Sequence, residues 1–182
     1  MNIYLVRHGE AASSWGQSSD PGLSELGRQQ AQQSADRLRS ELGESSELVS
    51  SPLSRAQETA APLAQLLQRP VSIEEAYREI PAPVPMEQRQ DWLRKFMRER
   101  WNTQPDSLLQ WRERAYRQLL GLQQDTVVFT HFLVINAIVG QVLERAETLY
   151  FWPDNGSITH LRHTGESLEL VELGEQMETV VN

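Results

Sequence analysis

The chain has 182 residues, no cysteine and a net charge of −8 at pH 7. This length predicts one domain, residues 1–182, that buries a core without disulfides or a structural metal. The absence of cysteine excludes thiolate metal sites and cysteine nucleophiles. The acidic balance, with no basic stripe, predicts no affinity for nucleic acid or an anionic membrane. Because the apolar runs are too short to span a bilayer and residues 1–6 lack signal-peptide flanks, we expect a cytoplasmic protein.

The first half of the chain alternates predicted strands and helices. Residues 2–6 (NIYLV) form an apolar run that is typical of a strand buried on both faces of a parallel sheet. Ser24 is a predicted N-cap, and apolar residues then recur at helical spacing until Gly43 ends the helix. The elements predicted next are a strand at 47–51, a helix from 54 to about 69 and a strand at 71–73.

The second half begins with a segment that excludes regular structure. Residues 80–85 (IPAPVP) carry three prolines and predict an extended loop. The elements predicted after it are helices at 86–101 and 107–123, a buried strand at 126–130, a helix at 132–145 and strands at 157–163 and 168–172. This alternation predicts an α/β fold of three layers, with helices on both faces of a mainly parallel sheet.

Charged and imidazole side chains follow the predicted strands. Arg7 and His8 end the first strand, His131 ends the strand at 126–130, Arg55 follows the second strand, and Glu79 follows the third. Because ligands bind at the carboxyl ends of parallel strands, we expect these five side chains to converge on one edge of the sheet.

These residue types suit the transfer of a phosphoryl group. Arg7, Arg55 and His131 can donate to the oxygens of a phosphate dianion, and guanidinium groups do so with paired hydrogen bonds. A neutral His8 can attack phosphorus in line with the leaving group. Glu79 can then protonate the leaving alkoxide and later activate water. The carboxylates Glu74, Glu75 and Glu87 are alternative candidates for the acid.

Several segments, in the same order along the chain, resemble the histidine phosphatase superfamily, the phosphoglycerate mutase-like proteins. They cover residues 3–161, nearly the whole chain. The segments are Arg7-His8-Gly9, DPGLSELGRQQA (20–31), SSPLSRAQETA (50–60), VVFTH (127–131) and DNGSITHL (154–161).

The resemblance implies a phosphoglycerate mutase-like fold and a reaction without metal or organic cofactor. It also implies that His8 is the phosphorylated nucleophile, that Arg7, Arg55, His8 and His131 form the phosphate pocket, and that Glu79 is the proton donor. Phe132 departs from the family, which often has glycine after the second histidine, and we expect it either to narrow the pocket or to displace His131. The segment after Glu79 is also atypical.

The sequence favours a metal-independent phosphatase that hydrolyses a small phosphomonoester. A cap-like helical insertion at 80–123 would cover the site and favour a small substrate over a phosphoprotein. The alternatives are a phosphohistidine or phosphoprotein phosphatase in signalling, a phosphoglycerate mutase, and a non-catalytic module that binds a phosphorylated ligand. The substrate and the oligomeric state stay open.

Other candidate residues have weaker signals. His160 and His163 point to opposite faces of a strand, so we expect no shared metal ion. Glu10 fits either the pocket edge or a charge beside a helix. Trp15 could border the substrate entrance, whereas the other tryptophans are expected in cores.

Overall fold

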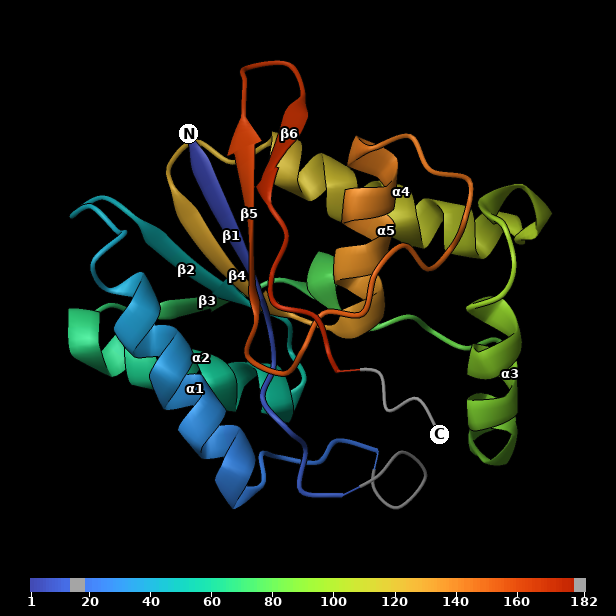
Figure 1. The fold of residues 1–182 in the computed structure, drawn as a ribbon, viewed down its shortest axis with the longest axis horizontal. Coiled ribbons are helices and arrows are strands. Elements are labelled where there is room, and N and C mark those ends of the chain that lie inside the picture. The colour runs from blue at the N-terminus through green and yellow to red at the C-terminus, as the bar shows by residue number, and fades with distance from the viewer. Residues whose placement is uncertain (14–18, 179–182) are drawn as a thin grey trace.

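The computed structural model describes residues 1–13 and 19–178. Within them, the chain forms a six-stranded sheet in the order β3-β2-β4-β1-β5-β6 (Figure 1). The first four strands of this order are parallel, whereas β5 and β6 run antiparallel to their neighbours. The strands are β1 (Asn2–Arg7), β2 (Glu47–Ser50), β3 (Val71–Ile73), β4 (Thr126–Thr130), β5 (Ile158–His163) and β6 (Leu168–Glu172).

Helices cover both faces of the sheet, which confirms the predicted three-layer α/β fold. One face carries α1 (Glu25–Leu38) and α2 (Ser54–Leu67), and the other carries α4 (Asp106–Leu120) and α5 (Phe132–Val142) (Figure 1). The short helix α3 (Arg89–Phe96) stands beside these layers.

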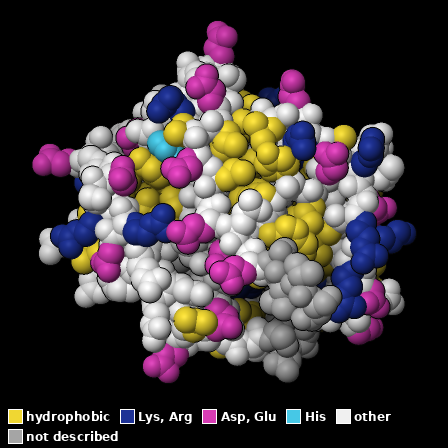
Figure 2. Space-filling model, viewed as in Figure 1, with side chains coloured by type: hydrophobic (Ala, Val, Ile, Leu, Met, Phe, Trp, Pro, Cys, Tyr) yellow, Lys and Arg dark blue, Asp and Glu magenta, His cyan; other side chains and the backbone are white. Residues whose placement is uncertain are grey.

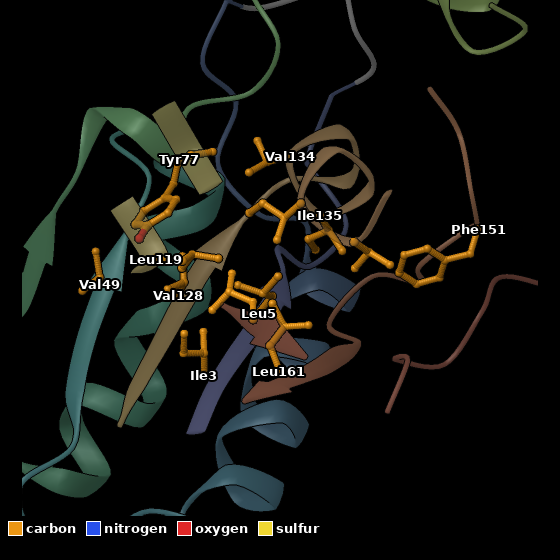
Figure 3. Packing of buried hydrophobic residues seen from close by; sticks show 14 residues of the cluster. Ile3, Leu5, Val49, Tyr77, Leu119, Val128, Val134, Ile135, Phe151 and Leu161 are labelled. Atoms are coloured by element: carbon orange, nitrogen blue, oxygen red, sulfur yellow. The ribbon is translucent and has the colours of Figure 1, made fainter. Parts of the chain in front are cut away.

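Alternation along β1 explains how the sheet holds the two helical layers together. Ile3 and Leu5 pack in the cluster that includes α4 and α5 (Figure 3), whereas Tyr4 and Val6 pack toward α1 and α2. All four side chains are buried. A strand that is apolar on both faces is the pattern of a sheet covered on both sides, as predicted for residues 2–6.

The predicted helix boundaries were wrong at several ends. Helix α1 ends at Leu38 rather than Gly43, because the amide of Glu41 bonds to the Leu38 carbonyl in a tight turn. Leu26, expected on the apolar face of that helix, is 50% exposed. Helix α5 ends at Val142 rather than 145, because Glu144 adopts a left-handed conformation with φ of 55°.

The helix predicted over 86–101 is divided. A 3-10 turn (Met86–Gln88) precedes α3, and a second one (Trp101–Thr103) follows it. Trp101 leaves the helical path because its amide bonds to the Ala146 carbonyl while its ring packs on Phe96. Residues 80–85 have no helix or strand, as predicted. Within the described part of the chain, no helix has the length and apolar character needed to cross a membrane.

On the face of the molecule in Figure 2, acidic side chains lie among the basic ones, and apolar groups are visible between them. No basic stripe runs across this face, in keeping with the net charge of −8.

Candidate active site

The site is built where three parallel strands end. His8 follows β1, Ser51 follows β2 and His131 follows β4. Backbone hydrogen bonds hold these ends in register: the His8 amide donates to the Thr130 carbonyl at 3.0 Å, and the Ser51 amide donates to the Phe129 carbonyl at 2.9 Å. Helices α2 and α5 begin directly after β2 and β4, so the positive ends of both helix dipoles lie near this edge of the sheet.

The hydrogen bonds of His8 define its protonation. Nδ1 lies 2.6 Å from the Gly9 carbonyl oxygen, and Nε2 lies 3.2 Å from Nε of Arg55. A carbonyl can only accept and a guanidinium can only donate, so the proton is on Nδ1 and Nε2 presents its lone pair. Burial, reinforced by the positive charges of Arg7 and Arg55, lowers the pKa of His8 to about 3. The imidazole is therefore neutral at physiological pH.

The loop after His8 is fixed by close packing. The Gly9 amide donates to Thr59 Oγ1 at 3.0 Å, and a side-chain carbon at Gly9 would lie 2.4 Å from the carbonyl oxygen of Gly27 on α1. Only glycine fits there without a backbone shift. From the other side, Nδ2 of Asn155 donates to the His8 carbonyl at 3.1 Å. These contacts fix the direction of the imidazole.

Arg7 is a half-buried cation at the end of β1. Its Nη1 donates to the Pro153 carbonyl at 2.9 Å, and its guanidinium carbon lies 5.1 Å from the centre of the Phe132 ring. Burial lowers the pKa of Arg7 to about 10, so it stays charged at neutral pH. Its Nε is buried and has no hydrogen-bond partner among the described residues.

His131 lies beside His8, with the ring centres 5.3 Å apart. It is fully buried, and its Nε2 lies 2.8 Å from Ser51 Oγ. Its Nδ1, like Nε of Arg7, has no partner within the part of the chain that is described. Burial first, and then the neighbouring charges, lowers the pKa of His131 well below the ordinary value. Buried polar atoms are rarely left unpaired, so Nε of Arg7 and Nδ1 of His131 are both candidate donors to a bound oxyanion.

Glu79 is the one sequence-predicted acid that the structure buries at this edge. Its Oε1 accepts from the Ile80 amide at 3.0 Å and its Oε2 from the Leu133 amide at 3.4 Å. Burial raises the pKa of Glu79, although these amides and Arg55 oppose the shift. The three rival carboxylates lie elsewhere: Glu74 caps a 3-10 turn, Glu75 pairs with Arg78 at 3.0 Å, and Glu87 is exposed.

An open cleft of about 210 Å³ leads to Arg55 and Glu79. Its polar lining residues are Ser19, Arg55, Arg78, Glu79 and Arg89. The Phe132 ring packs against Arg7 and Trp152 and is not among the residues that line this cleft.

The sequence did not identify Arg78 and Arg89 as site residues. It included Ser51, Thr59 and Asn155 only as motif positions, without their bonds to His131, Gly9 and His8. The one sequence feature that could have identified Arg78 as a site residue is its position next to Glu79.

The remaining sequence candidates lie apart from the cleft. Glu10 accepts from Ser24 Oγ at 2.7 Å, so it supports the start of α1. His160 bonds to the Asn2 side chain and His163 to the Leu120 carbonyl, and the described residues hold no group of three His, Asp or Glu side chains suited to a metal. Of the tryptophans expected in cores, Trp101 is buried, whereas Trp152 is 43% exposed. Trp15 lies outside the described residues.

Solved structures with the same fold come from several organisms. A phosphoserine phosphatase from Entamoeba histolytica, in complex with 3-phosphoglyceric acid, is 24% identical, with 97% of this chain and 98% of that chain covered at a TM-score of 0.76. A mycobacterial glucosyl-3-phosphoglycerate phosphatase is 22% identical, with coverage of 97% and 99% and a TM-score of 0.76. YhfR of Bacillus stearothermophilus is 20% identical, with coverage of 94% and 95% and a TM-score of 0.77.

A search of curated proteins gave no match. The sequence model of the histidine phosphatase superfamily (branch 1), however, matches residues 3–176. The chain therefore belongs to the histidine phosphatase superfamily.

Proposed function

We propose that the protein is a metal-independent phosphatase that hydrolyses a small phosphomonoester through a phosphohistidine at His8. The observation that carries the proposal is the neutral imidazole of His8, which presents the Nε2 lone pair beside the Arg55 guanidinium while Arg7 also contributes positive charge. A neutral nucleophile among cationic donors is the arrangement that phosphoryl transfer requires.

In the first half-reaction, His8 Nε2 attacks phosphorus and the bond from phosphorus to the ester oxygen breaks. Arg7 and Arg55 donate to the non-bridging oxygens. Nδ1 of His131, which has no partner among the described residues, donates to one of these oxygens as well. Burial raises the pKa of Glu79 and so favours its acid form, which gives its proton to the leaving oxygen. The alcohol product departs and a phosphorylated His8 remains.

In the second half-reaction, water replaces the alcohol. The Glu79 carboxylate takes a proton from the water as its oxygen attacks phosphorus, and the bond between phosphorus and His8 Nε2 breaks. Inorganic phosphate leaves, and Glu79 and His8 return to their starting protonation. The positive charge comes from the Arg7 and Arg55 side chains, so the proposed reaction needs no metal ion.

A small substrate fits the size of the cleft, about 210 Å³. We further propose that residues 1–182 form one histidine phosphatase domain and that 80–123 acts as its cap-like insertion. Met86 and Arg89 of that insertion line the cleft, and Leu93 and Phe96 pack with Phe132 of α5. A cytoplasmic location also belongs to the proposal, and cell fractionation tests it.

The test is phosphate release from a panel of phosphomonoesters with chelator present, compared between the native protein and His8→Ala. We expect release that survives the chelator and is lost in the variant. A folded native protein that releases no phosphate from any ester would contradict the proposal. Release that disappears with chelator and returns with added metal would contradict its metal-independent part.

A further inference from the structure

Phe132 directly follows His131, yet the proposed reaction gives its side chain no task. It is the first residue of α5, and only 7% of its surface is exposed. It belongs to the same buried cluster as Leu93 and Phe96 of α3, so a purely structural role is one explanation for it. Its ring also contacts Arg7, however, which belongs to the proposed phosphate pocket. This contact connects Phe132 with the reaction centre.

Arg7 is oriented by an aromatic ring and a carbonyl group instead of a carboxylate. None of the salt bridges among the described residues includes Arg7. Its guanidinium carbon lies over the Phe132 ring, 5.1 Å from the ring centre, and its Nη1 donates to the Pro153 carbonyl at 2.9 Å. The sulfur of Met177 lies 3.5 Å from the same Nη1. The ring therefore blocks one side of the guanidinium, while the carbonyl holds one end of it.

These contacts leave one pair of donors of the guanidinium to a ligand. Both hydrogen bonds from the Arg7 side chain to described residues use Nη1, whereas its Nε is buried without a partner among those residues. Nε and Nη2 of an arginine lie on the same side of the guanidinium, and they can donate together to two oxygens of one phosphate. An Arg7 side chain that is held through Nη1 therefore keeps this pair of donors available for phosphoryl oxygens.

The Phe132 ring is itself held in place. Its ring centre lies 5.4 Å from that of Trp152, with an angle of 66° between the two rings, and the Trp152 carbonyl accepts from the Met177 amide at 2.8 Å. The face of an aromatic ring attracts a guanidinium electrostatically, and more strongly where water is excluded. Burial disfavours the charge of Arg7 and lowers its pKa to about 10. The attraction to the ring offsets part of this cost.

We propose that Phe132 is a positioning residue, whose ring holds the Arg7 guanidinium in the orientation that binds the phosphoryl group. This inference rests on the proposed phosphatase function, which supplies the group that Arg7 binds. A free arginine side chain loses conformational entropy when a ligand orders it, and an arginine that the ring already holds avoids part of this loss. The ring therefore strengthens phosphate binding without contacting phosphate.

Calorimetric binding of inorganic phosphate tests this role without turnover. Phe132→Leu keeps an apolar side chain but removes the aromatic face, and we expect a Kd roughly 3-fold to 10-fold higher, the cost of ordering one arginine side chain. Phe132→Tyr keeps the ring, so its Kd should stay within about 2-fold of the native value. Equal increases in the two variants would overturn the proposal, because they would assign the loss to packing and not to the aromatic face.

The matched control is Phe96→Leu, the same change at another ring of the same cluster. The ring of Phe96 packs on Trp92 and Trp101, and it makes no ring contact with a proposed site residue. The phosphate Kd of this variant should stay within about 2-fold of the native value. Exchange of the Arg7 Nε proton with water, followed by NMR, should be faster in Phe132→Leu and unchanged in Phe96→Leu. Equal behaviour of the two variants in both measurements would overturn the proposal.

A double-mutant cycle shows whether Phe132 acts through Arg7. Arg7→Met removes the guanidinium, so Phe132→Leu in that background should raise the phosphate Kd by less than about 2-fold. A residue that only supports the fold would cause the same loss with and without the guanidinium, and that result would contradict a positioning role. Thermal unfolding checks that each variant is folded.

Hydrolysis of the ester panel separates this inference from the proposed function. In an active protein, Phe132→Leu should lower kcat/KM at least as much as it lowers phosphate affinity, because Arg7 also contacts the phosphoryl group in the transition state. Hydrolysis that does not depend on the ring would leave the function and overturn the positioning role. Phosphate binding that depends on the ring, in a native protein that hydrolyses no ester, would overturn the function and support the positioning role. Absence of both hydrolysis and phosphate binding would overturn both.

Discussion

The histidines of the chain form two pairs in contrasting surroundings. His8 and His131 follow the ends of parallel strands, are buried, and lie with their ring centres 5.3 Å apart. His160 and His163 lie within the antiparallel strand β5 and are only partly buried. All four lie beside apolar sequence, but the first pair follows strand ends whereas the second pair lies within a strand.

The difference lies in what the ring nitrogens contact. His163 Nε2 donates to the Leu120 carbonyl and its Nδ1 accepts from the Gly165 amide, so backbone groups satisfy both nitrogens. At the other pair, His8 Nε2 faces a guanidinium, and His131 Nδ1 has no partner in the described residues. A histidine that has a ring nitrogen beside a charged group, or without a hydrogen-bond partner, can bind a ligand through that nitrogen. A histidine whose two ring nitrogens both bond to the backbone has a structural role.

The largest effect expected from this contrast is the loss of turnover in His8→Asn. Removing a covalent nucleophile should lower kcat on the order of 10³-fold or more. His163→Asn, the matched change in the other pair, should keep kcat within about 2-fold of the native value, since His163 contacts no proposed site residue. Phosphate release and an alkaline rapid quench that traps the phosphorylated protein measure the two roles. Equal kcat values in the two variants would contradict the assignment of a catalytic role to His8 and a structural role to His163.

A second large effect concerns Glu79→Gln. Loss of the proton donor should lower kcat/KM about 10²-fold to 10⁴-fold for an alkyl phosphate, and much less for p-nitrophenyl phosphate, whose leaving group needs no proton. The control is Glu75→Gln, because that carboxylate is exposed and paired with Arg78. Equal losses with both leaving groups would exclude the role of Glu79 as general acid.

The pH dependence gives the same residue a second test. Burial raises the pKa of Glu79, and the acid form is the one that the first step needs. The kcat/KM for the alkyl ester should therefore fall as pH rises through the pKa of Glu79, and Glu79→Gln should lack this alkaline decline. On the acid side, His8 stays neutral down to a pKa of about 3, so its protonation should cause no decline near neutrality.

Ser51→Ala should moderately weaken phosphate binding, and it tests which ring nitrogen of His131 carries the proton. Ser51 Oγ accepts from the Leu53 amide at 3.2 Å and can donate its proton to His131 Nε2, which leaves the proton of a neutral His131 on Nδ1. Without the hydroxyl, we expect roughly 10-fold weaker binding of inorganic phosphate. Nitrogen NMR of His131 should show the Nδ1-H form in the native protein and a mixture in the variant. A native protein in the Nε2-H form would contradict this orientation.

The sequence allowed prediction of what depends on local pattern. Apolar β-branched runs placed β1 and β4 within one residue of their observed ends. The positions of His8 and His131, which directly follow these strands, were therefore predicted equally well. The rule that parallel strands share a carboxyl edge then predicted their convergence.

What the sequence could not predict depends on contacts between distant segments. The course of the chain after Phe96 is set by the hydrogen bond from the Trp101 amide to the Ala146 carbonyl. The spacing of apolar residues in the sequence does not predict this bond. The contribution of Arg89 to the cleft depends on where α3 begins, and the bond from Asn155 to His8 spans 147 residues. The predicted helix over 86–101 therefore gave neither the break in the helix nor the cleft lining.

The smallest predicted effect is a loss of stability on substitution of His160, a member of the histidine pair in β5. His160 stacks on Tyr4 with ring centres 4.6 Å apart and bonds to Asn2 at 2.8 Å, so His160→Ala should lower the free energy of unfolding by about 1–2 kcal/mol. Burial lowers the pKa of His160, so folding favours its neutral form, and this part of the stability is present above about pH 6.5 and lost as pH falls. Urea unfolding of both proteins should therefore show a difference that shrinks at acid pH, with unchanged kcat at pH 7. A difference that grows toward acid pH would reverse the sign assigned to His160, and a large loss of kcat would place this histidine with the site pair instead.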